Sequence, residues 1–194
     1  MSWIEYLGDG IVHITDFQGY DHMVYLIALV SIFEWREVKR VVLLATAFTI
    51  GHSLTLILAA LDVIRPNSSV IEFLIPITIL ITGLSNLRYA KRVKEPVPWH
   101  GLRYAAAISF GLIHGMGFSS YFRMIVEKGE SIVSPLLFFN LGVEIGQLII
   151  LAVFILITFL FHGWFRIQQR DWIIFFAGLT AGISAMLCIE TWPF

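Results

Sequence analysis

Three histidines lie deep inside long apolar stretches of the chain. They are His22 in GYDHMVYL, His52 in FTIGHSLTL and His114 in FGLIHGMGF. Glu144 interrupts another apolar stretch, and Asp21 directly precedes His22, where it can orient the imidazole or join it as a ligand. Three imidazoles with one or two carboxylates suit a borderline divalent cation such as Zn²⁺, Ni²⁺, Co²⁺ or Fe²⁺, whereas Mg²⁺ and Ca²⁺ prefer oxygen ligands. These five residues are therefore the candidate metal ligands.

Six apolar segments are long enough to carry such residues across a membrane. A hydrocarbon core of about 30 Å requires about 20 apolar residues in a helix. We predict spans over residues 12–33, 41–61, 70–89, 104–126, 135–161 and 172–190. Hydrophobic residues make up 58% of the chain and charged residues only 14%, whereas soluble domains carry about 25% charged residues. The predicted fold is an all-α polytopic membrane protein with six transmembrane helices, forming a single transmembrane domain over residues 1–194.

The basic residues are distributed unevenly between the loops on the two sides of these spans. Ten of the 13 Lys and Arg residues fall in loops on one side and three on the other. Because short cytoplasmic loops carry an excess of Lys and Arg, the first side is predicted to be cytoplasmic and both termini to face outward. The net charge of -1 leaves no basic surface for nucleic acid, and the single Cys188 permits neither an intrachain disulfide nor a CxxC metal site.

The predicted spans bring several candidate ligands to a common depth. At 1.5 Å per residue, His52 and His114 lie about 16 and 15 Å above the cytoplasmic ends of their spans, and Glu144 lies about 14 Å below the outer end of its span. A charged residue near the midplane costs about 2.5 to 3.5 kcal/mol on insertion scales. Because that cost needs a compensating use, these residues are predicted to have a functional role.

The first predicted span contains further polar residues and is interrupted by Gly19. If this span is continuous, Asp21 and His22 reach the depth of the other ligands. If the chain breaks near Gly19, a short interfacial helix precedes a buried helix. His13 and Asp16 share a helical face, but His13 is nine residues from His22 and half a turn out of phase at 100° per residue. We expect His13 and Asp16 to join the site only if the chain breaks.

Other polar side chains accompany the candidate ligands on their own helices. Asn140, Glu144 and Gln147 recur with helical spacing and line one stripe of the fifth span. Thr49 and Ser53 share a helical face with the histidine of the second span. We expect Asn140, Gln147, Thr49 and Ser53 to support the ligands or to line a pathway for the ion.

In five blocks that cover nearly the whole chain, the sequence resembles the HupE/UreJ family of small membrane proteins. The blocks are, in order, HITDFQGYDHMVYLIAL, TAFTIGHSLTL, EFLIPITILITGLSNL, FGLIHGMGF and FFNLGVEIGQ. That family is regarded as metal permeases and is associated with nickel supply to hydrogenase and urease, and its first-span His and Asp motif corresponds to Asp21 and His22. The resemblance implies a permease of a bacterial inner membrane, acting on a divalent transition metal ion such as Ni²⁺, Zn²⁺ or Co²⁺.

The sequence departs from the nickel-type members of that family in two motifs. Seven residues separate His13 from Asp21, a longer spacing than in those members. The HG motif of the fourth span continues as Gly115-Met116-Gly117-Phe118, without the acidic residue expected in the nickel branch. The chain therefore resembles a divergent branch, and the resemblance leaves the choice of metal open.

Three functions are compatible with these residues. In the first, a permease receives the metal ion from the outer side and passes it to the cytoplasm through the His and carboxylate site. In the second, a membrane-embedded metal-dependent hydrolase uses Asp21 or Glu144 to activate a metal-bound water against a lipid-like substrate, with a set of His, Asp and Ser similar to that of alkaline-ceramidase-type hydrolases. The third is an assembly partner with a structural metal. We favour the permease, although the apolar cytoplasmic halves of the spans favour the enzyme or a closed state; a homo-oligomer is compatible with each function.

Overall fold

All of the regular secondary structure among the residues that the structure describes is helical. The computed structural model describes residues 2–17, 19–93, 100–125 and 132–193. Within them the elements are α1 (Trp3–Thr15), α2 (Asp21–Val30), a 3-10 helix (Trp35–Glu37), α3 (Val38–Ala60), α4 (Ser68–Ala90), α5 (His100–Ile125), α6 (Val133–Gly163) and α7 (Gln169–Glu190). The prediction of an all-α fold is confirmed.

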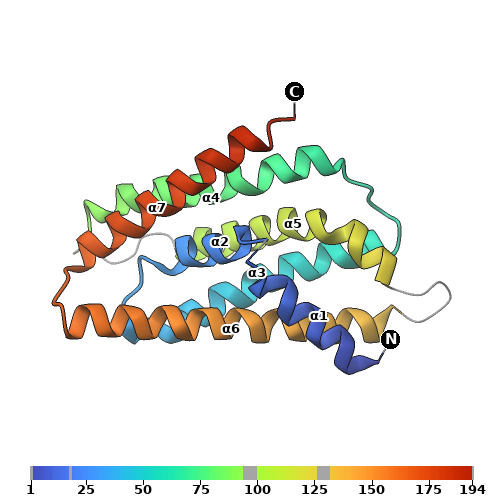
Figure 1. Ribbon diagram of the computed structural model, residues 1–194, viewed down its shortest axis with the longest axis horizontal. Coiled ribbons are helices and arrows are strands. Elements are labelled where there is room, and N and C mark those ends of the chain that lie inside the picture. Colours follow the sequence, from blue (N-terminus) through green and yellow to red (C-terminus); the bar gives the residue numbers. More distant parts are fainter. Residues whose placement is uncertain (1, 18, 94–99, 126–131, 194) are drawn as a thin grey trace.

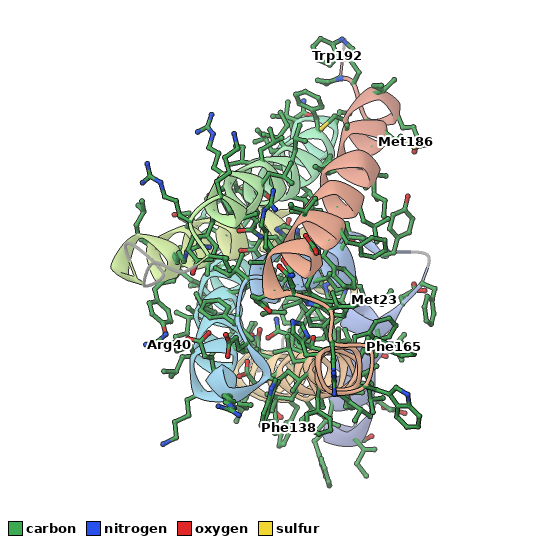
Figure 2. The ribbon with its side chains drawn as sticks, turned by 90° about the vertical axis from the view of Figure 1, so that its left-hand side faces the viewer. Met23, Arg40, Phe138, Phe165, Met186 and Trp192 are labelled. Atoms are coloured by element: carbon green, nitrogen blue, oxygen red, sulfur yellow. The ribbon has the colours of Figure 1, made fainter. Side chains whose placement is uncertain are left out.

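Five of the predicted spans coincide with one helix each, α3 to α7. Among the described residues, four helical segments are long and apolar enough to cross a membrane: Trp35–Ala60, which combines the 3-10 helix and α3, and the helices α4, α6 and α7. Met186, Trp192 and Phe165 project outward from the ribbon in Figure 2, and more than half of each side chain is exposed. An apolar exterior of this kind is what a lipid environment solvates.

The first predicted span is the exception, because residues 12–33 do not form one helix. α1 ends at Thr15, Asp16 has an extended backbone with ψ 123°, and α2 begins only at Asp21. α1 also starts earlier than predicted, at Trp3, where Ser2 and Glu5 form a capping box that satisfies free N–H groups of the first turn. The prediction of a continuous helix over 12–33 is wrong, and the alternative with a break near Gly19 describes the chain better.

The long helices pack as three pairs, shown in Figure 1 as α4 with α7, α3 with α5, and α1 with α6. Glycines permit the close approach of two of these pairs. A Cβ atom at Gly51 of α3 would collide with the carbonyl oxygen of Ile108, and one at Gly111 of α5 with that of Phe48. Gly142 brings α6 equally close to Leu7 of α1. Small residues at such interfaces allow helix backbones to meet in the absence of a hydrophobic driving force.

The short helix α2 lies in the middle of the bundle, in contact with α4, α6 and α7. Its carboxyl end is held by two amide side chains. Asn86 of α4 donates a hydrogen bond to the carbonyl oxygen of Ala28 at 2.5 Å, and Gln169 donates one to that of Ile32 at 3.0 Å. The last carbonyls of a helix have no partner within it, so these bonds fix a helix too short to cross the bundle alone.

Candidate metal centre

Four histidines from four different helices gather around the break between α1 and α2. His13 comes from the last turn of α1, His22 from the first turn of α2, His52 from α3 and His114 from α5. The ring centroids of His13 and His22 lie 4.6 Å apart, those of His13 and His52 5.6 Å, and those of His22 and His114 5.2 Å. The break is what brings His13 to the others, as expected for a chain that does not continue as one helix.

Three of these imidazoles could hold one metal ion. Among the described residues, one ring nitrogen from each of His13, His22 and His52 lies within 4.8 Å of the other two. Nitrogens bound to one ion at about 2.0 to 2.1 Å lie about 3.4 Å apart in tetrahedral geometry, so small side-chain rotations would bring all three to a common ion. His114 stands beside this group, against the ring of His22.

The ring nitrogens of the cluster are arranged as a metal site requires. Nδ1 of His114 lies 2.9 Å from the carbonyl oxygen of Phe110, which can only accept, so Nδ1 carries the proton and Nε2 has a free lone pair. Nδ1 of His22 lies 3.0 Å from Oδ1 of Asp21, the carboxylate partner that commonly orients a ligating histidine. The Nε2 atoms of His13, His22 and His114 and both ring nitrogens of His52 are buried without a hydrogen-bond partner among the described residues.

Burying so many unpartnered nitrogens together has a physical cost. Each buried polar group without a hydrogen-bond partner destabilises the folded protein by about 1 to 3 kcal/mol. His22, His52 and His114 are each at most 6% exposed. Imidazole nitrogens without a hydrogen-bond partner are the donor type that a borderline divalent cation prefers.

Glu144 lies outside this group of three histidines, on the interface between α3 and α6. Its Oε1 atom accepts a hydrogen bond of 2.6 Å from the hydroxyl of Thr46. The predicted support residues lie on the same interface: the hydroxyl of Thr49 donates to Oε1 of Gln147 at 3.0 Å, and the hydroxyl of Ser53 donates to Oδ1 of Asn140 at 2.6 Å. We call these three hydrogen-bonded pairs the polar seam.

The polar seam continues along α3 from the histidine cluster toward the start of that helix. On α3 it runs from Ser53, beside His52, back to Thr46, a distance of about 10 Å at 1.5 Å per residue. Its direction is toward the start of α3, the end predicted to be cytoplasmic. The expectation that this half of the helices is apolar is therefore too simple. Thr46 was missed, although its spacing to Thr49 and Ser53 places all three on one helical stripe.

A pocket of about 210 Å³ lies next to Asp21, the carboxylate that is bonded to His22. Its lining includes Asp21 at the start of α2, Glu72 near the start of α4 and Thr191 just after α7. Asp21 thus faces the pocket and also orients His22. Asp16, the other acidic candidate, is exposed at the end of α1. Glu72 is not among the ligands predicted from the sequence, because one acidic residue near the end of a span carries no distinguishing signal.

The fold and this site together define an integral membrane protein with a buried histidine cluster at a helix break. A family model described as HupE / UreJ protein matches residues 1–191, and the chain belongs to that family. Members of the family are associated with nickel or cobalt transport or with urease maturation. No curated protein and no solved structure matches the chain.

Proposed function

We propose that the protein is a permease that carries a divalent transition metal ion, Ni²⁺, Co²⁺ or Zn²⁺, from the outer side of the bacterial inner membrane to the cytoplasm. The observation that carries the proposal is the convergence of His13, His22 and His52 on one space at the break between α1 and α2. Transporters characteristically build ion sites where a membrane helix is interrupted, because the ends of the two half-helices supply ligands there.

In this proposal α1 and α2 together make one discontinuous span, and α3 to α7 make the other five. α5 has 26 residues, about 39 Å at 1.5 Å per residue, which exceeds the hydrocarbon thickness of about 30 Å. With the Lys and Arg distribution, six spans put both termini on the outer side. The pocket beside Asp21 then lies on the outer side of the cluster, where α4 begins and α7 ends.

The chemistry of the ligands favours an ion as cargo. Imidazole nitrogens coordinate borderline cations in their neutral form, so metal binding competes with protons and releases them. Asp21 and Glu72 line the pocket through which an ion would arrive, and carboxylates raise the local concentration of cations. A route of this kind is what distinguishes the permease from the hydrolase, which instead needs a pocket for a lipid-like substrate.

The test is uptake by the purified full chain in proteoliposomes. We expect time-dependent uptake of Ni²⁺, Co²⁺ or Zn²⁺ into the lumen and its loss on His52→Ala substitution. The matched control is His162→Ala, because His162 is bonded to the carbonyl oxygen of Thr158 in α6 and is not one of the three grouped histidines. If the wild-type protein binds the metals tightly but moves none of them, the permease is refuted and the metal-dependent hydrolase becomes the better reading.

A further inference from the structure

We propose that the polar seam forms the cytoplasmic-side half of the ion path, and that Glu144 is a second cation-binding position in it, separate from the histidine cluster. This inference rests on the proposed transport function. In this inference the polar seam conducts the ion and also joins α3 to α6 by hydrogen bonds.

The first argument is the choice of a carboxylate. The Thr49–Gln147 and Ser53–Asn140 pairs join α3 to α6 with neutral groups. A third neutral pair would serve the same packing role, whereas a carboxylate at this depth costs about 2.5 to 3.5 kcal/mol on insertion scales. Association of α3 with α6 therefore does not account for a carboxylate at position 144.

The second argument is that the seam keeps unpartnered polar atoms. Thr46 satisfies Oε1 of Glu144, but Oε2 of Glu144 and Nε2 of Gln147 are buried with no hydrogen-bond partner among the described residues. Gln147 is fully buried. The free carboxylate oxygen of Glu144 and the hydroxyl oxygen of Thr46 beside that carboxylate are oxygen ligands that a divalent cation accepts.

The third argument is continuity with the cluster. Ser53 adjoins His52 in α3, and the seam ends at Thr46, about 9 Å from His52 along the helix axis at 1.5 Å per residue. From His52 to the start of α3 the distance is about 21 Å by the same rise. Without Glu144 an ion would cross that distance with no acidic ligand from the described residues of α3 and α6, so the carboxylate divides it into two shorter steps.

The seam ends against an apolar layer. Leu44 of α3 and Leu151 and Phe154 of α6 lie next along the two helices, and all three are buried in one apolar cluster. The conformation described is therefore closed on this side. Glu144 is the last charged group before the closure, where an ion would wait until α3 and α6 separate.

The histidine site and the Glu144 site differ in how tightly they bind a cation, and release into the cytoplasm requires this difference. Nitrogen ligands bind borderline cations tightly and select them, whereas a carboxylate with neutral oxygens binds them less tightly. Conduction needs binding strong enough for entry and weak enough for exit. An imidazole site followed by an oxygen site has that order.

The experiment measures metal binding and transport separately on the same full-length variants. Ni²⁺ alone is the probe, titrated calorimetrically into the detergent-solubilised protein and followed as initial uptake in proteoliposomes. For Glu144→Gln we expect Ni²⁺ affinity at the histidine cluster to stay within about threefold, while the initial uptake rate falls about tenfold or more. Thr46→Val keeps the carboxylate and removes only its hydroxyl partner, so we expect a smaller fall in uptake.

Matched controls come from outside the seam. Glu190→Gln removes a carboxylate at the end of α7, and Thr158→Val removes a buried hydroxyl of α6 that bonds to its own helix. Both should transport like the wild type. Wild-type uptake by Glu144→Gln overturns the second position, and loss of Ni²⁺ binding as severe as in His52→Ala shows that Glu144 belongs to the cluster and also overturns it. Absence of uptake by the wild-type protein would instead refute the transport function itself. If Glu144→Gln does not fold, undiminished uptake by Thr46→Val overturns the proposal.

Discussion

Replacing His13 tests the site most sharply, because its inclusion depends on the helix break. If His13, His22 and His52 bind one ion, His13→Ala should weaken Ni²⁺ binding as much as His52→Ala does. Residues that merely orient metal ligands cost about 10 to 100-fold in affinity when replaced, so loss of one of three ligands should cost at least about 100-fold. That factor corresponds to about 2.7 kcal/mol of binding free energy.

The effect of His114→Ala should be smaller, about tenfold, because His114 contacts His22 but lies outside the three mutually close nitrogens. The ranking of the variants is therefore the prediction. Isothermal titration of the purified full chain with Ni²⁺ measures it, and His162→Ala supplies a histidine control outside the group.

Loss of packing must be separated from loss of a ligand. The ring of His13 lies 3.8 Å, centroid to centroid, from the ring of Phe118. His13→Phe keeps an aromatic ring at this contact but removes both nitrogens, so affinity should fall as in His13→Ala while thermal stability is retained. If His114→Ala weakens binding more than His13→Ala does, the assignment of the three ligands is refuted.

Two further predictions concern the scaffold. Gly111→Ala should destabilise the protein by about 1 to 3 kcal/mol or prevent folding, because its Cβ would collide with the backbone of α3; Gly182→Ala in α7, which has nothing within 4 Å, should be neutral or slightly stabilising, and thermal unfolding followed by tryptophan fluorescence compares the two. A reporter fused to the C-terminus should behave as exported, as six spans with both termini outside require, and cytoplasmic reporter activity would mean that the number of spans or their orientation is wrong.

The helices that could be predicted are those for which the membrane sets the length. An apolar run of about 20 residues has few other uses, so hydropathy predicts α3, α4, α6 and α7, which lie in the segments apolar enough to cross a membrane among the described residues. The fourth predicted span coincides with α5, which is helical but less apolar. Hydropathy does not predict α1 and α2, because 13 and 10 residues fall below the length of a span. The signal that could have located α1 is local, since Ser2 and Glu5 have the spacing of a capping box just before its first turn.

The geometry of the site depends on the depth of each residue in the membrane and also on the direction in which its side chain faces around the helix. The rise of 1.5 Å per residue predicts similar heights for His52 and Glu144, but Glu144 is bonded to Thr46, about 9 Å from His52 along α3. Height also does not say which way a side chain faces around its helix. The direction that a side chain faces depends on the neighbouring helix, and Glu144 accepts a hydrogen bond from Thr46 of α3 and does not join the group of His13, His22 and His52.

The same limitation explains His13. Its phase of half a turn relative to His22 holds only while 100° per residue accumulates along an unbroken helix. Residues 16, 17, 19 and 20 lie outside both helices, so α1 and α2 can present His13 and His22 to one space. The break that defeats the periodic prediction is thus the feature that assembles the three nitrogens. The proposed site therefore takes its ligands from the ends of two half-helices, which is how the discontinuous helices of transporters build their ion sites.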